Sequence, residues 1–305
     1  MKQKTIIIGF VAFLANSVFA YNFLFTSHNE EAVAIANENG KILWKMKADH
    51  PQRADISADG KHIFVSTLHG AFMAEVATKK ILWKYNCPTV KWQGAETDKR
   101  KKGDTVQLQN PVAQILGNDR FLVGNEGIST LLEINSKGEV LKEIKSESLK
   151  KAEHGEFRLA SKTSDGKYIF PLLESALLTV YNSDGKQLRR IQTSSGVVSA
   201  EILDDNSILA GGIFGIAVFD KNNKKIWSFT DVELQKALGT KAPVIICDVK
   251  VLPNKNLLCT TYGDKSIPDV IELTFAKKIV KTIDFPQHCE MSALQILDNN
   301  LKPIK

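Results

Sequence analysis

Histidine, arginine and acidic residues recur shortly before a series of apolar segments in this 305-residue sequence. The sets are His50 with Arg53, His154 with Arg158, and His288 with Glu290. Guanidinium groups match the two-pronged geometry of carboxylate, sulfate and phosphate, and histidine serves as hydrogen-bond donor, base or metal ligand near neutral pH. If the fold brings these side chains together, they form a binding site for an anionic ligand.

Three further side chains belong to the same candidate set. Asp248 lies in an apolar segment, and His69 lies on a predicted turn. Trp92 lies in the longest insertion, Cys87 to Asn110, which also carries the basic run Lys99 to Lys102. Long segments of this kind in compact proteins are often functional or disordered, so a lid or partner surface and a disordered loop are both open.

A repeated unit must position these residues. Six segments share an apolar strand, a short polar turn and a second strand, as in Ala34 to Lys45. The second strands of the other copies begin near Ile81, Val140, Gln187, Lys225 and Ile279. An earlier hairpin precedes most copies, with turns such as Asp59-Gly60 and Asp165-Gly166. Each pair of hairpins predicts a four-stranded antiparallel sheet.

Sheets that recur every 40 residues or so are typical of a β-propeller, here with six blades. An antiparallel sandwich is the alternative, but a sandwich has no reason to repeat one unit six times. Seven blades remain open if Lys91 to Gln109 contains a degenerate blade.

The two ends of the chain complete each other. Ser292 to Ile296 resembles a first strand that lacks the rest of its blade, and the strands from residue 21 to 47 lack a first strand. We therefore expect the C-terminal strand to be the innermost strand of the N-terminal blade, because an unpaired inner strand leaves backbone groups unsatisfied.

The repeats resemble the PQQ-like and WD40-like bacterial propeller repeats, in which a Gly-Lys-x-x-Trp pattern follows a strand. Only Trp44, Trp83 and Trp227 keep the tryptophan, and no adjacent cysteine pair is present to cover a quinone ring. The resemblance implies the fold. No cofactor is predicted, PQQ is not expected, and a divalent metal is left open.

In such a blade, blade-to-blade links and the turns between strands two and three emerge on one face, around the channel mouth. Loops on a rigid scaffold commonly carry binding groups. Histidines on different blades can lie about 15 Å apart, which is too far for one metal with Zn–N bonds of about 2.1 Å. Two hypotheses follow.

The first is a non-catalytic binding protein with a small molecule, glycan or protein at the channel-mouth face. The second is an enzyme, either a metal-assisted hydrolase or lyase or a histidine-based group transferase on an anionic substrate. No nucleophile elbow, phosphate-binding glycine loop, HExxH or EF-hand motif occurs in the sequence, and the binding protein is the favoured hypothesis.

The first twenty residues predict a signal peptide, because Lys2 and Lys4 precede an apolar run and Val18-Phe19-Ala20 supplies a cleavage site. We expect one propeller domain over residues 21–305, periplasmic or secreted, without a lipoprotein cysteine or a membrane span. The formal net charge of +6 is mild, so no nucleic-acid partner is expected, and we expect a monomer. Disulfide pairing among Cys87, Cys247, Cys259 and Cys289 stays open, with Cys247 and Cys259 as a candidate cross-strand pair.

Overall fold

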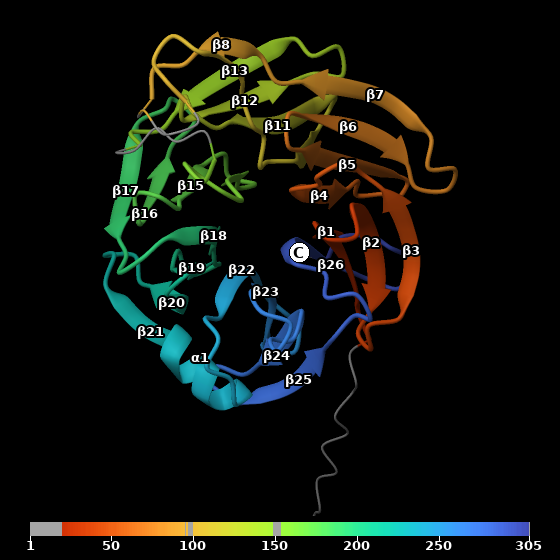
Figure 1. The fold of residues 1–305 in the computed structure, drawn as a ribbon, viewed down its shortest axis with the longest axis vertical. Coiled ribbons are helices and arrows are strands. Elements are labelled where there is room, and N and C mark those ends of the chain that lie inside the picture. The colour runs from red at the N-terminus through yellow and green to blue at the C-terminus, as the bar shows by residue number, and fades with distance from the viewer. Residues whose placement is uncertain (1–19, 95, 97–99, 149–153, 305) are drawn as a thin grey trace, which may run out of the picture.

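Six four-stranded antiparallel sheets form a ring, in agreement with the predicted six-bladed β-propeller (Figure 1). The computed structural model describes residues 20–94, 96, 100–148 and 154–304. Blade 1 consists of β26 (Met291–Leu297), β1 (Asn22–Ser27), β2 (Ala32–Asn37) and β3 (Ile42–Lys47), from the inside outward. Blade 2 consists of β4 (Arg53–Ile56), β5 (His62–Thr67), β6 (Gly70–Glu75) and β7 (Ile81–Asn86).

The remaining blades repeat this order along the chain. Blade 3 is β10 (Gln114–Gly117), β11 (Arg120–Asn125), β12 (Thr130–Ile134) and β13 (Val140–Lys145). Blade 4 is β14 (Ser161–Lys162), β15 (Tyr168–Leu172), β16 (Leu177–Tyr181) and β17 (Gln187–Gln192). Blade 5 is β18 (Val197–Ile202), β19 (Ile208–Gly212), β20 (Gly215–Phe219) and β21 (Lys225–Thr230). Blade 6 is β22 (Ile245–Val251), β23 (Leu257–Tyr262), β24 (Val270–Leu273) and β25 (Ile279–Ile283).

Burial follows the position of each strand in its blade. The middle strands are apolar and buried on both sides, as β12 and β16 show along their whole length. The outer strands carry lysine, glutamate and arginine and are partly exposed, as β13 and β17 show. Blades pack face to face, so a middle strand needs apolar side chains in both directions while an outer strand borders solvent.

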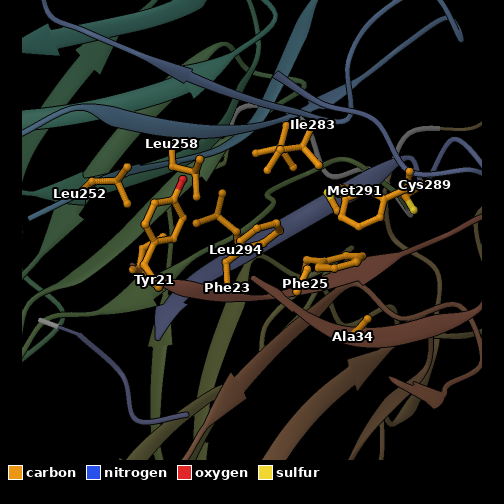
Figure 2. Packing of buried hydrophobic residues seen from close by; sticks show 14 residues of the cluster. Tyr21, Phe23, Phe25, Ala34, Leu252, Leu258, Ile283, Cys289, Met291 and Leu294 are labelled. Carbon is orange, nitrogen blue, oxygen red and sulfur yellow. The ribbon is translucent and has the colours of Figure 1, made fainter. Parts of the chain in front are cut away.

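The ring closes where the sequence predicted. β1 pairs antiparallel with β26, with Phe25 opposite Leu294. Figure 2 shows the apolar cluster at this junction, where Phe23 and Phe25 pack with Met291, Leu294 and side chains of blade 6. The Tyr21 hydroxyl donates a hydrogen bond to Glu272 Oε2 of blade 6 at 3.1 Å. The last strand of the chain thus completes the blade begun at residue 22 and packs it against blade 6.

Side chains of the inner strands also link successive blades. A carboxylate or amide oxygen of one inner strand accepts the backbone N–H of the next inner strand. The pairs are Gln295 with Ile56 (2.9 Å), Asp55 with Ile115 (2.6 Å), Gln114 with Lys162 (2.8 Å) and Asp248 with Leu294 (3.1 Å). These bonds satisfy inner-edge N–H groups that have no further strand to pair with.

A second set of links joins the outer strands. In β3 and β21, Trp44 and Trp227 donate from Nε1 to the carbonyl oxygens of Val76 and Phe275 in the following blade, each at 2.8 Å. Arg189 occupies the equivalent position in β17 and donates to the carbonyl oxygen of Asp220 in blade 5. The tryptophans of the repeat are therefore blade-to-blade contacts.

The insertion between blades 2 and 3 is not a seventh blade. It carries a two-stranded hairpin, β8 (Thr89–Lys91) and β9 (Thr105–Gln107). A helix follows blade 5, α1 (Asp231–Leu238), which begins with a capping box between Thr230 and Glu233.

Three other sequence predictions concern the termini and the cysteines. Residues 1–19 of the predicted signal peptide lie outside the described residues. Among the residues that are described, no helix has the length and apolar character needed to cross a membrane. The four cysteines are buried free thiols, and Val249, not Cys247, lies opposite Cys259.

Candidate functional site

The blade topology places twelve connections on one face, here called the loop face. They are the six links between β3 and β4, β7 and β10, β13 and β14, β17 and β18, β21 and β22, and β25 and β26, together with the turn between the second and third strands of each blade. Every inner strand begins at this face. Residues His28, His50, Gln109, Glu126 and Arg158 all belong to these connections.

Arg158 is the most buried of the predicted site residues with a positive charge. Its side chain is 10% exposed, and its Nη2 donates to the side-chain oxygen of Gln52 at 2.8 Å. Its Nη1 is buried and has no hydrogen-bond partner within the described chain. Buried polar atoms are normally paired, so this orphaned donor needs an explanation.

Glu126, at the end of β11, is the acidic group nearest to that donor. Its Oε2 lies 3.9 Å from Arg158 Nη1, beyond hydrogen-bond distance. Its Oε1 accepts the backbone N–H of Gly155 at 2.8 Å. Burial raises the pKa of Glu126 to about 8, although Arg158 and Gly155 oppose the increase. Below that pH the carboxyl is mostly neutral, and it does not neutralise Arg158.

Glu156 holds the segment that carries Arg158. Its carboxylate accepts the backbone N–H groups of Gly127 (2.7 Å) and Ser129 (3.0 Å), as well as the Ser129 hydroxyl. Burial raises the pKa of Glu156, and these hydrogen bonds oppose the increase. Glu156 is thus engaged by blade 3 and fixes the backbone beside Arg158.

Three histidines lie within electrostatic reach of this arginine or of each other. His28, in the turn between β1 and β2, has a pKa lowered to about 4, mainly by burial and then by the positive charges of Arg158, His154 and His50. His154 Nδ1 lies 2.7 Å from Gln109 Oε1. His50 is exposed, and its Nδ1 lies 2.7 Å from Asp49 Oδ1.

Arg158 also acts electrostatically on two residues of blade 6. The charge of Arg158 acts against the raised pKa values of Cys247 on β22 and Tyr262 at the end of β23. The carboxylate of Glu290 contributes to raising both pKa values. Arg158 thus bonds Gln52 at the start of blade 2, lies 3.9 Å from Glu126 of blade 3, and acts electrostatically on residues of blades 1 and 6.

The other predicted site residues are held by protein groups. Arg53 Nη1 donates to the carbonyl oxygens of Leu159 (3.3 Å) and Ala160 (2.9 Å). The Asp248 carboxylate accepts N–H groups of Val249 and Leu294. Both side chains therefore join segments of the ring.

His69, Trp92 and His288 lie toward the edge of the cluster. His69 Nδ1 is 3.1 Å from the Leu108 carbonyl oxygen, and Trp92 is 2% exposed, with its ring against Gly127. His288 lies between Asp269 Oδ1 (3.1 Å from Nδ1) and the Gly263 carbonyl oxygen (3.0 Å from Nε2). These three side chains lie against protein groups elsewhere on the loop face, whereas His50, His154 and Arg158 all act electrostatically on His28.

His28, Glu126 and Gln52 were not among the predicted site residues. His28 lies in the turn of blade 1 that corresponds to the turn of His69 in blade 2. The predicted register of blade 1 therefore already placed His28 on the loop face. Glu126 gave no such signal, because its burial and its distance from Arg158 depend on the link 154–160.

A second group of ligand-type side chains lies at the rim of this cluster. Glu31, Asp49 and His50 each place one ligand atom so that the three atoms lie within 4.8 Å of one another. Glu31 is half-buried, while Asp49 and His50 are exposed. One histidine nitrogen and two carboxylate oxygens suit a divalent cation such as Zn²⁺ or Mn²⁺.

Comparisons with known proteins place the chain in a class by its fold alone. No protein-family model and no curated protein sequence matches it. A crystal structure of a protein of unknown function from Bacteroides caccae has a TM-score of 0.70 and 20% identity, covering 90% of this chain and 97% of the other.

Virginiamycin B lyase from Staphylococcus aureus is a second structural neighbour. Its catalytically inactive histidine-to-alanine variant, solved with quinupristin, has a TM-score of 0.59 and 12% identity, covering 90% of this chain and 88% of the lyase. The class that fold and comparisons define together is the β-propellers.

Proposed function

We propose that this protein is an exported binding protein that holds a small anionic ligand at the axial end of the loop face, with Arg158 as its anchor. The ligand class is a carboxylate, sulfate or phosphate. The observation that carries the proposal is the buried Nη1 of Arg158, which has no hydrogen-bond partner among the described residues.

The energetics favour a bound anion over a permanently unpaired guanidinium. A buried charge without a hydrogen-bonded counter-charge is costly, and a charge-assisted bond from arginine to an anion is among the stronger hydrogen bonds in proteins. Gln52 already fixes Nη2, so Nη1 is presented in one orientation. His28, neutral at pH 7, and His154 are near enough to interact with Arg158 or with each other, and both can supply N–H donors.

Isothermal titration calorimetry at pH 7 with acetate, sulfate and phosphate as probes tests this proposal. At least one of these anions binds the wild-type protein, and Arg158→Gln weakens that binding about tenfold or more. Arg158→Lys keeps the positive charge but loses the two-pronged guanidinium geometry. We therefore expect a loss of affinity smaller than that in Arg158→Gln. Arg190→Gln, on the exposed side of β17, is the matched control and leaves the affinity unchanged.

Thermal unfolding of each variant separates loss of the site from loss of the fold. If Arg158→Gln retains the wild-type Tm and binds all three anions with wild-type affinity, or if no anion binds wild type, the proposal is wrong.

A metal-assisted hydrolase or lyase is the second candidate, because Glu31, Asp49 and His50 form a three-ligand set on the loop face. The structural similarity to a lyase supports the same candidate, at the level of the fold. Calorimetric titration with Zn²⁺, Mn²⁺ and Mg²⁺ tests this metal site. We expect one of these ions to bind the wild-type protein, and His50→Ala and Glu31→Gln each to abolish its binding. Retention of metal affinity in both variants excludes this site.

Export rests on the predicted signal peptide over residues 1–20. The position of Tyr21 supports it, since Tyr21 is 3% exposed and the first strand begins directly after it. N-terminal sequencing of protein from the periplasm or medium of an expressing bacterium gives Tyr21 as the first residue. A mature protein that starts at Met1 contradicts export by this route.

A further inference from the structure

A groove with a volume of about 520 Å³ lies between blades 4 and 5, away from Arg158. One wall is the end of β17 with the link to β18, and the other is β21. Ala217 and Phe219 of β20 contribute to the lining between them, together with Phe214. The volume is within the range of small-ligand sites in proteins.

Side chains of blades 4 and 5 shape this groove. Arg189 replaces the outer-strand tryptophan and bonds Asn206, Asp220 and Asn223, of which Asn223 lines the groove. In the strand pairing, Ala217 stands where the larger Phe72 of blade 2 and Ile271 of blade 6 stand, and blade 1 also has an alanine there, Ala34. Ser228 stands where the longer Lys45 and Lys84 stand. The short side chains of Ala217 and Ser228 in blade 5 leave room in the interface at this point.

The walls offer hydrogen-bonding groups at short intervals. Serine hydroxyls line the groove on both sides, from Ser194 and Ser195 on one wall and Ser228 on the other, while the hydroxyls of Thr193 and Thr230 are engaged by protein groups. A hydroxyl both donates and accepts, so it can satisfy either the N–H or the C=O of an extended backbone. Phe214 and Phe219 supply apolar surface for side chains of the occupant.

Opposite charges mark the two ends of the groove. Lys225 begins β21 and Asp231 directly follows it, and both line the groove. Five residues lie between them, and the six residue steps from Lys225 to Asp231 correspond to about 20 Å of extended strand. An extended peptide of about six residues spans the same length. A neutral oligosaccharide has no groups that complement the two charges.

We infer that the groove between blades 4 and 5 binds an extended peptide segment of about six residues that carries an acidic group at one end and a basic group at the other. The acidic group lies at Lys225 and the basic group at Asp231. This site is separate from the anion site of the proposed function.

Fluorescence polarisation with a labelled pool of hexapeptides tests the inference. Each peptide has glutamate at one end, lysine at the other and a varied apolar and polar centre. A second pool replaces both end residues by glutamine. The dipolar pool contains binders with dissociation constants below about 1 mM, and their glutamine-ended counterparts bind about fivefold to tenfold more weakly.

Ala217→Phe and Ser228→Lys restore the bulk that other blades carry at these positions, so both are compatible with the blade. Each weakens the selected peptides about tenfold or more. Thr282→Lys, the same substitution at the exposed equivalent position of β25, is the control and leaves binding unchanged. The double reversal K225E/D231K shifts preference to the peptide with its ends exchanged.

Arg158→Gln leaves peptide binding intact, which separates this inference from the anion site. The inference is overturned if neither pool binds, if glutamine-ended peptides bind as well as dipolar ones, or if binding persists in folded Ala217→Phe and Ser228→Lys. Binding of maltose or cellobiose in place of the peptides, lost in the same two variants, also overturns it in favour of a glycan.

Discussion

Glu126 Oε2 lies 3.9 Å from Arg158 Nη1, while Glu126 Oε1 accepts the Gly155 N–H at 2.8 Å. The carboxyl is close enough to compete electrostatically with a bound anion, yet it makes no hydrogen bond to that nitrogen. Because burial raises the pKa of Glu126 to about 8, its charge changes within an accessible pH range. We therefore expect Glu126 to couple the proposed anion binding to pH.

The first prediction is that anion affinity falls as pH rises from 7 to 9. Ionised Glu126 neutralises Arg158 and repels the ligand, so we expect the dissociation constant to increase about tenfold. This increase corresponds to a loss of about 1.4 kcal/mol of binding free energy. Glu126→Gln stays neutral and keeps its pH 7 affinity at pH 9. Calorimetric titration of the best-binding anion at pH 7, 8 and 9 measures both. An identical pH profile in wild type and Glu126→Gln would show that another group controls binding.

The second prediction concerns acid stability. The folded pKa of His28 is about 4, below its ordinary value of 6.5, so the unfolded chain binds the proton more readily. Above pH 6.5 the contribution of His28 to the free energy of unfolding does not change with pH. As the pH falls from 6.5 toward 4, the free energy of unfolding decreases because the unfolded chain takes up the proton first. The loss is at most about 3 kcal/mol.

Urea unfolding at pH 7, 6, 5 and 4 measures it. His28→Asn unfolds with a flatter pH dependence over this range than wild type. Asn29→Ser, in the same turn, retains the wild-type slope. A wild-type slope in His28→Asn means that the acid sensitivity arises elsewhere.

Much of the fold could be predicted because its cause is local. Each hairpin is encoded by apolar strands around a polar turn, and six copies of one unit imply a ring. Even the pairing of the last strand with β1 followed, since each end of the chain lacked what the other supplied. The hairpin β8–β9 was missed, because its short polar strands lack the apolar alternation of a blade.

A third prediction tests the blade-to-blade role of the outer tryptophans. Trp44→Phe removes the bond from Nε1 to the Val76 carbonyl oxygen, which we expect to cost about 1 kcal/mol beyond the change in volume. Trp83→Phe is the matched control, because Trp83 packs between Phe64 and Phe121 by ring contacts. Urea unfolding compares them. Equal losses in the two variants would remove the hydrogen bond as a source of stability.

The fourth prediction concerns ring closure. Met291 is fully buried in the junction of blades 1 and 6, so Met291→Ala leaves a cavity and destabilises the protein by about 2–5 kcal/mol. Val280→Ala, at a position 45% exposed on β25, changes stability by less than about 0.5 kcal/mol. A loss below 1 kcal/mol in Met291→Ala would mean that the junction contributes little.

The candidate site was less predictable than the fold. Repeat register placed Arg158, His154 and His50 on one face, but it gave no information about which side chains the protein itself engages. Arg53 and Asp248 occupy inner positions like those of ligand-binding residues, yet their partners are backbone groups of other segments. Such distances depend on how the links fold over the ring, which no local pattern encodes.

The most direct test of the central claim is a crystal structure of the wild-type protein with selenate, measured at the selenium absorption edge. We expect an anomalous peak within about 4 Å of Arg158 Nη1, and no peak there in Arg158→Gln crystals. A wild-type map without selenium at this position, at a concentration that saturates binding in solution, would contradict an anion site anchored by Arg158.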